Sequence, residues 1–141
     1  MNKEIAKQVN ALLKQLSENS KNITLATLRT IAKSGATELW LLEYKKTIIG
    51  MATLVLVTIP TVTFARIEDV VVDGQYRGKG LGEKISKKLI LRARARGAVF
   101  IDLTSRPERV AANKLYQKLG FEKRNTNVYR LPLQEKNKRL L

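Results

Sequence analysis

The fold of this chain is decided by the stretch QYRGKGLG, residues 75–82. It joins a run of β-branched and apolar residues typical of a strand, residues 64–72, to residues 80–96, where apolar side chains recur at helical spacing. The alternating glycines leave the backbone N–H groups at the start of this helix open to an anion. The stretch therefore predicts a loop that binds a phosphate group.

Other phosphate loops fit this spacing less well. A Walker loop needs Ser or Thr directly after Gly-Lys, but Gly78-Lys79 is followed by Gly80. The dinucleotide fingerprint needs a third glycine where Glu83 stands, although Asp102 lies where that motif places its ribose-binding acid. A glycine-rich turn without a ligand stays an open alternative.

On both sides of this loop, segments whose apolar residues recur at helical spacing alternate with segments whose pattern is typical of strands. The expected order is ααβββαβαββ, with helices at residues 2–20, 24–33, 80–96 and 107–119, strands at residues 38–44, 47–59, 64–72 and 98–103, and a terminal hairpin at residues 121–133. Lys45 and Lys46 would form the turn of the first hairpin. The strand, helix and strand over residues 64–103 should form a right-handed parallel crossover, so we expect a mixed sheet in an α/β fold.

The length, the net charge and the absence of two residue types limit the number of domains, the kind of ligand and the side chains available for catalysis. The 141 residues suit one domain, which we place at residues 1–133, before a charged tail at residues 134–141. With 27 Lys and Arg against 12 Asp and Glu, the formal net charge is +15, which favours anionic ligands. Because the chain has no Cys and no His, catalysis must use carboxylates, Tyr, Lys, hydroxyls or backbone groups, and we expect no metal. Without a secretory signal or a membrane span in the sequence, we expect a cytoplasmic protein.

The motif R-x-x-G-x-G at residues 77–82 resembles the signature of the GCN5-related N-acetyltransferases (GNAT), which is Arg or Gln, two residues, Gly, one residue, and Gly or Ala. A match that starts at Gln75 overlaps it, but Arg77 stands at the expected distance beyond the preceding strand. Residues 67–72 and 115–121 are similar to the other two hallmarks of this superfamily, in the same order. The resemblance implies a single-domain GNAT-like fold whose usual first strand is truncated or absent here.

The resemblance also implies acetyl-CoA as the donor of an acetyl group to a primary amine, bound in an opening between the strands that end at Val72 and Leu103. Backbone groups of the first of these strands would pair with the pantetheine arm, and N–H groups of the glycine loop would hold the diphosphate. A strand N–H would face the oxygen of the tetrahedral intermediate. The residues implied in cofactor binding are Val70, Val71, Val72, Arg77, Gly78, Lys79, Gly80, Leu81, Gly82 and Glu83.

Two side chains are candidates for proton transfer. With no His, we expect a carboxylate as base, and Glu68 stands two positions before Val70 and hence on the same strand face, whereas Asp69 would point the other way. A salt-bridged surface Glu68 is an equal alternative. Tyr116 matches the family's tyrosine that protonates the departing thiolate. It would also sit in the last turn of its helix, where a Schellman motif closed by Gly120 favours an apolar contact.

The sequence departs from the family pattern in two places. The position of a coenzyme-contacting Asn holds Arg109, and the nearest Asn is Asn113, so both are candidates for that contact; Tyr116 is a third residue expected at the coenzyme. Ser105 and Glu108 form a capping box, which predicts the start of a helix rather than a functional site. The missing first strand would expose a sheet edge, from which we expect a homodimer.

The acceptor is the least determined part of the prediction. Residues 67–70 with the loop are similar to the glucosamine-phosphate acetyltransferase branch, and we expect the acceptor site at the first two helices, their connection and residues 126–130. A basic stripe follows the loop, and its members are Lys84, Lys88, Arg92 and Arg96. It is typical of a solubilising face. As a functional surface it would attract the coenzyme's phosphates or a polyanion. The polyanion alternative leads to a nucleic-acid-binding module without catalytic activity or to an acetyltransferase acting near RNA or the ribosome.

Overall fold

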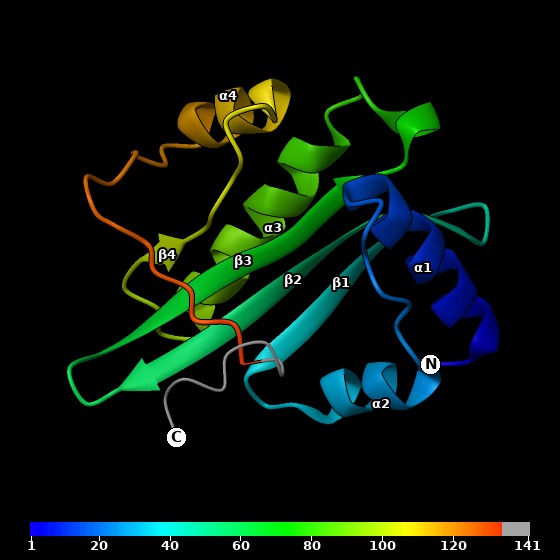
Figure 1. The fold of residues 1–141 in the computed structure, drawn as a ribbon, viewed down its shortest axis with the longest axis horizontal. Helices are drawn as coiled ribbons and strands as arrows, with labels where there is room; N and C mark the ends of the chain where they lie inside the picture. The colour runs from blue at the N-terminus through cyan, green and yellow to red at the C-terminus, as the bar shows by residue number, and fades with distance from the viewer. Residues whose placement is uncertain (134–141) are drawn as a thin grey trace.

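The computed structural model describes residues 1–133 and builds them around a four-stranded sheet in the order β1-β2-β3-β4 (Figure 1). The strands are β1 (Thr37–Tyr44), β2 (Thr47–Ile59), β3 (Val62–Val72) and β4 (Ile101–Asp102). The helices are α1 (Lys3–Leu16), α2 (Leu25–Lys33), α3 (Leu81–Ala95) and α4 (Val110–Lys118), with the 3-10 turn η1 (Gly74–Tyr76) between β3 and α3. Because β1 to β3 are antiparallel and β3 pairs with β4 in parallel, the predicted mixed sheet is confirmed. The expected tail at residues 134–141 lies outside the described residues.

Two apolar clusters lie on opposite faces of this sheet. The cluster under α3 consists of Ala52, Leu54, Ala65, Ile67, Ile85, Leu89 and Ala93. The cluster under α1 consists of Val9, Leu12, Ile48, Met51 and Val71. Neighbouring residues of β2 and β3 alternate between the clusters, as the strand pleat requires. Burying a large aliphatic side chain contributes about 1.5–3 kcal/mol, so these clusters hold both helices against the strands.

The turn between β1 and β2 lies at Lys45 and Lys46, as predicted. Both residues have positive φ, 46° and 65°. Such a pair of left-handed residues is the geometry of a type I′ turn, which matches the right-handed twist of the two strands.

Half of the predicted basic stripe anchors α3 to β1. The Glu38 carboxylate on β1 accepts hydrogen bonds from Nη2 of Arg92 at 2.8 Å and from Nη1 of Arg96 at 2.6 Å. The indole N–H of Trp40 donates to the same carboxylate at 3.1 Å. The Arg92 bond, ahead of the other contacts, lowers the pKa of Glu38. Of the stripe, Lys84 and Lys88 are exposed, whereas Arg92 and Arg96 are partly buried.

The expected terminal hairpin does not form within the described residues, because residues 121–133 contain no strand. Two physical reasons account for this. The strand expected at residues 98–103 is reduced to the two residues of β4, which offers a hairpin little edge to pair with. Pro132 also lacks the N–H that a paired strand would use. Val128 and Tyr129 are consequently 78% and 88% exposed, and the observed order is ααβββαβα.

The predicted capping box is also wrong. α4 begins at Val110, and its N-cap is Arg109, whose side chain makes no capping hydrogen bond. Instead, Nδ2 of Asn113 donates to the carbonyl oxygens of Arg106 and Arg109 at 2.8 and 3.0 Å, which fixes the turn before the helix. The Ser105 hydroxyl is buried without a hydrogen-bond partner.

The start of the chain follows the expectation. Residues 1–133 contain no strand before α1, and the Oδ1 atom of Asn2 caps this helix by accepting from the backbone N–H of Ile5 at 2.9 Å. Among the helices in the described part of the chain, none is long and apolar enough to cross a membrane.

Candidate functional site

β4 pairs with β3 over only two residues, and an opening follows where β3 continues without a partner. The paired positions are Ala65 with Ile101 and Arg66 with Asp102, whereas β3 continues to Val72. Beyond Arg66, the edge of β3 that faces away from β2 therefore has no partner in β4. Backbone groups on this edge are available to side chains or to a ligand.

Two arginines occupy that edge. Nη2 of Arg109 donates to the carbonyl oxygen of Val70 at 3.1 Å, and Nε of Arg77 donates to the carbonyl oxygen of Val72 at 2.9 Å. Both carbonyls therefore point into the opening, at the positions where the sequence resemblance implied contacts with the pantetheine arm. A ligand that pairs with this edge must displace the two guanidinium groups.

The glycine loop leads from this edge to the start of α3. Gly78 and Gly80 have φ values of 75° and 73°, which only glycine adopts without strain, and a Cβ at either would meet no atom within 4 Å. Gly80 is the N-cap of α3 and supplies no side-chain cap, so the N–H groups of Leu81, Gly82 and Glu83 begin the helix without one. The loop thus presents unshielded N–H groups to open space, as an anion site requires.

The remaining loop residues hold the neighbouring elements together. A Cβ on Gly82 would lie 3.4 Å from Cδ2 of Leu115, an ordinary van der Waals distance, so Gly82 faces α4. The Glu83 carboxylate binds Nζ of Lys118 on α4 and Nζ of Lys87, each at 2.7 Å, and these bonds lower the pKa of Glu83 to about 2. Nζ of Lys79 lies 5.3 Å from the ring centre of Tyr76.

β3 contains a bulge that changes which side chains face the site. Met51 pairs with Val71 but Thr53 pairs with Glu68, so Asp69 and Val70 together stand opposite one residue of β2. Asp69 has a positive φ of 52°. The extra residue reverses the alternation, so Glu68 and Val70 lie on opposite faces of the sheet. The predicted shared face of Glu68 and Val70 is therefore wrong.

The two adjacent carboxylates at the bulge have different surroundings. Glu68 forms an ion pair with Nη2 of Arg66 at 2.8 Å, and both side chains are over one third exposed, so this pair adds little stability. Asp69 keeps solvent access, yet partial desolvation and the neighbouring Glu68 carboxylate raise its pKa. Because side chains alternate along a regular strand, the sequence predicted that Asp69 points away from the site. The sequence signal that could have identified Asp69 is that Asp tolerates the left-handed conformation of such a bulge.

Tyr116 closes α4 as predicted. The N–H of Phe121 donates to the carbonyl of Tyr116 and the N–H of Gly120 to that of Gln117, each at 3.0 Å, which is a Schellman motif. The rings of Tyr116 and Phe121 lie 5.8 Å apart, edge to face. Burial raises the pKa of the Tyr116 hydroxyl, and the nearby Arg109 guanidinium partly opposes this rise. Arg109 therefore affects the pKa of Tyr116 and also hydrogen-bonds to the β3 edge. The Asn113 amide, by contrast, makes its hydrogen bonds within the turn before α4.

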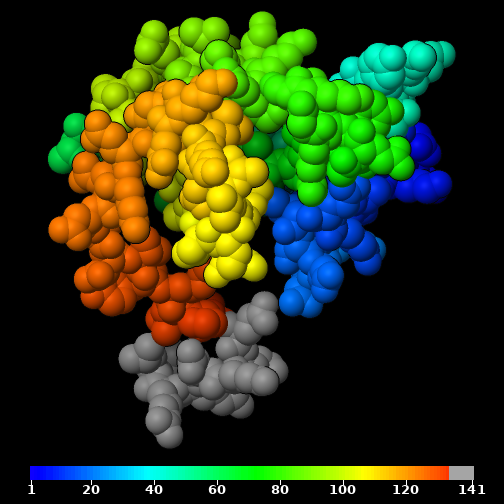
Figure 2. All heavy atoms as spheres, turned by 90° about the horizontal axis from the view of Figure 1, so that it is seen from above, coloured from blue at the N-terminus to red at the C-terminus, as the bar shows by residue number. Residues whose placement is uncertain are grey.

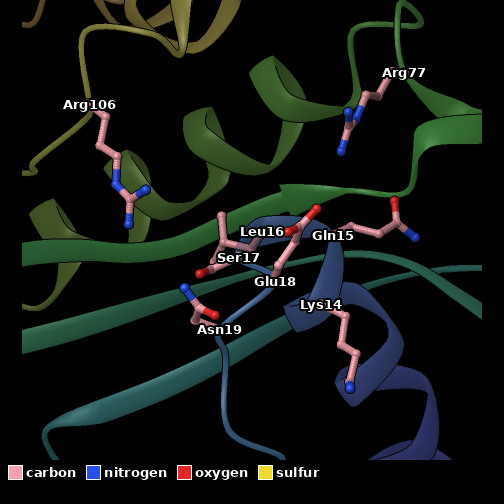
Figure 3. A pocket seen from close by; sticks show the side chains of 8 residues that line it. All are labelled: Lys14, Gln15, Leu16, Ser17, Glu18, Asn19, Arg77 and Arg106. Carbon is pink, nitrogen blue, oxygen red and sulfur yellow. The ribbon is translucent and has the colours of Figure 1, made fainter.

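A polar cavity of about 580 Å³ lies beside the opening. Figure 2 shows the segment after β4, in yellow, facing the end of α1, in blue, across a hollow. The lining residues are Lys14, Gln15, Leu16, Ser17, Glu18, Asn19, Arg77 and Arg106 (Figure 3). The end of α1 and the connection to α2 were expected at the acceptor site, but residues 126–130 do not line this cavity.

A model described as the acetyltransferase (GNAT) family matches residues 7–121. The chain belongs to this family. Glucosamine 6-phosphate N-acetyltransferase 1 of Oryza sativa subsp. japonica is 39% identical over 62 residues, which cover 44% of this chain and 36% of that protein. The match thus spans about a third of the rice protein's length.

Solved structures of GNAT relatives share the whole fold. A putative acetyltransferase from Agrobacterium tumefaciens superposes with a TM-score of 0.82 at 19% identity, covering 94% of this chain and 96% of that one. An aminoglycoside N-acetyltransferase in complex with CoA gives a TM-score of 0.78 at 19% identity, covering 94% and 91%. At these identities the likeness concerns the fold, which agrees with the predicted GNAT-like architecture.

Proposed function

We propose that this GNAT protein transfers the acetyl group of acetyl-CoA to a primary amine. The observation that carries the proposal is the unpaired edge of β3, which leads directly into the open glycine loop. The edge offers the carbonyls of Val70 and Val72 to the amides of an extended arm, as an added strand would use them. The loop offers N–H groups at the start of α3 to the diphosphate at the other end of that arm. Acetyl-CoA carries amides along its pantetheine arm and a diphosphate at the far end of that arm, so it could contact both the β3 edge and the loop.

The reaction requires two proton transfers. The amine nitrogen attacks the thioester carbon, and its extra proton passes to a base. The tetrahedral intermediate then expels the thiolate as the carbon–sulfur bond breaks, and an acid protonates the sulfur. A backbone N–H on β3 near Val70 would stabilise the negative oxygen of the intermediate, a contribution of about 3 kcal/mol for a preorganised donor.

For the base, the carboxylates at the β3 bulge are the candidates, and we favour Asp69 over Glu68. The Glu68 carboxylate is held by the Arg66 guanidinium, which occupies one of its oxygens. Desolvation and the neighbouring Glu68 carboxylate raise the pKa of Asp69, which makes it a better proton acceptor than an ordinary aspartate. A water held by either carboxylate would serve in the same role.

For the acid, we propose Tyr116. Its raised pKa keeps the hydroxyl protonated at neutral pH, so a proton is available to the thiolate. Its buried ring packs on Phe121, which limits its movement. The packing role in the Schellman motif and the acid role are compatible, because the ring packs while the hydroxyl is polar.

Small-molecule amines are the acceptors that we favour. The rice relative is named for a phosphorylated amino sugar and the CoA-bound structural neighbour for aminoglycosides, so both names point to amines on sugars. Nucleic-acid binding without catalysis is less favoured, since Arg92 and Arg96 of the basic stripe are engaged with Glu38. Homodimer formation and a cytoplasmic location stay predictions.

Calorimetric titration with acetyl-CoA, followed by an assay of free thiol with a panel of amines, tests the proposal. We expect micromolar binding and amine-dependent thiol release. Tyr116→Phe should reduce kcat by about 10²-fold or more, whereas Tyr44→Phe, at a tyrosine that is 49% exposed at the end of β1, should not. Absence of heat with acetyl-CoA would exclude the acetyltransferase activity, and an unchanged kcat in Tyr116→Phe would withdraw the acid role.

A further inference from the structure

We infer that the amine acceptor carries an anionic group, a phosphate or a carboxylate, which binds to Arg106 in the polar cavity, across from Arg77. This inference rests on the proposed acetyl transfer and specifies the class of its second substrate. It depends on the position of the cavity, on unsatisfied donors in its walls and on the charges that surround it.

The cavity lies next to the proposed donor site and shares Arg77 with it. Arg77 follows β3 and η1, and Arg106 follows β4, so both stand at the carboxyl ends of parallel strands, where ligands bind in α/β sheets. The third wall is the end of α1, which covers the sheet face opposite to α3. An acceptor in this cavity would therefore approach the β3 edge from the α1 side, while the N–H groups at the start of α3 remain free for the diphosphate.

Both guanidinium groups have N–H donors without a hydrogen-bond partner among residues 1–133. Figure 3 shows Arg77 and Arg106 reaching from two sides toward the end of α1. The Arg106 side chain makes no hydrogen bond or ion pair within residues 1–133, and Arg77 uses only its Nε there, for the carbonyl of Val72. Free guanidinium forks bind phosphate and carboxylate oxygens through paired, charge-assisted hydrogen bonds.

The other charged groups favour an acceptor of mixed charge. Glu18 is the one carboxylate among the residues that line the cavity, and it suits an amine or ammonium group. Lys14 lines the cavity too, but Figure 3 shows its side chain directed away from both arginines. With two arginines against one glutamate, and a net charge of +15 on the chain, a polycationic acceptor would be repelled, whereas an amine with an anionic group meets complementary charge.

Matched pairs of acceptors test this inference in binding. Glucosamine 6-phosphate and glucosamine differ by a phosphate, and L-lysine and 1,5-diaminopentane differ by a carboxylate. Each is titrated calorimetrically into the protein saturated with CoA, so that the donor site is already filled. We expect the anionic member of at least one pair to bind about tenfold or more tightly than its neutral partner. The pair that shows the preference identifies the anionic group.

Two variants assign the preference to the arginine. Arg106→Gln should abolish it without changing the affinity for CoA, and Arg94→Gln, at an exposed position of α3, should leave it intact. Equal binding within both pairs, or a preference that survives Arg106→Gln, would overturn the inference. Weaker CoA binding by Arg106→Gln would also overturn it, because the arginine would then serve the coenzyme. If CoA itself does not bind, the acetyl transfer fails, and the same titrations without CoA still decide the anion site.

Discussion

At Asp69, a single inserted residue decides which carboxylate faces which side of the sheet. We expect Asp69→Asn to lower kcat by about 10²-fold, because the amide cannot accept the proton. The raised pKa of Asp69 places the acidic limb of the pH–rate profile above the ordinary range of an aspartate, since the base must be ionised to act. Steady-state kinetics across pH measures both effects.

The fold should tolerate this change. Asn adopts positive φ as readily as Asp, so the bulge is preserved, and an uncharged side chain removes the cost of ionising a partly desolvated group next to Glu68. Thermal unfolding near neutral pH should therefore show an equal or higher Tm for Asp69→Asn. Glu68→Gln is the matched comparison: a larger kcat loss in Glu68→Gln than in Asp69→Asn would move the base to Glu68.

Arg109 is a second residue whose effect depends on pH. Its guanidinium lowers the pKa of Tyr116, so Arg109→Met should raise that pKa further. The acid must be protonated, and activity falls as the pH rises through its pKa. The alkaline limb of the kcat/KM profile should consequently shift to higher pH in Arg109→Met and return toward the original position in Arg109→Lys. An alkaline limb that stays in place in both variants would show that Arg109 does not act on the proposed acid.

Among the elements, the attachment of α3 to β1 depends on Glu38. Glu38→Gln should destabilise the fold near pH 7 by about 1 kcal/mol, a value reduced because Arg92 keeps solvent access. The lowered pKa means that this contribution is present above the usual pKa of Glu and is lost as the pH falls through the lowered value. Urea unfolding at a series of pH values from about 7 downward should show a difference in unfolding free energy between wild type and variant that shrinks as the pH falls.

The elements also show where sequence reasoning succeeds and where it stops. Period and turn chemistry predicted α3, the Lys45-Lys46 hairpin and the Schellman motif at Gly120, because each depends on local contacts. The bulge at Asp69 was not predictable, since it depends on the register with β2. The terminal hairpin was predicted from a good turn signal, but a strand forms only where a partner edge exists, and β4 offers two residues.

The residues of the candidate site divide in the same way, into those that the local sequence predicts and those that depend on contacts between distant parts of the chain. The glycine loop was predicted because its function depends on absent side chains and on backbone φ, both of which the sequence states directly. The contacts of Arg109 with Val70 and of Arg77 with Val72 join parts of the chain through long side chains whose direction no local pattern gives. The polar cavity is assembled from three separate segments, and only its wall at the end of α1 and the following connection was expected at the acceptor site.

For the whole molecule, the net charge of +15 should govern encounters with a donor that carries several phosphates. We expect KM for acetyl-CoA to rise several-fold between about 0.05 and 0.5 M salt, because screening weakens long-range attraction. An uncharged osmolyte at equal osmolality should leave KM unchanged, and a KM that does not respond to salt would show that the basic surface has no part in capturing the donor.

The two arginines on the open edge of β3 have a further consequence for the protein in the absence of its substrates. A row of unpaired main-chain groups on an exposed strand is a template on which another polypeptide can grow a sheet. By occupying the carbonyls of Val70 and Val72 with bulky cations, Arg109 and Arg77 place like charges where an intruding chain would have to align. The two arginines thereby guard against self-association at the surface that the proposed acetyl transfer would use.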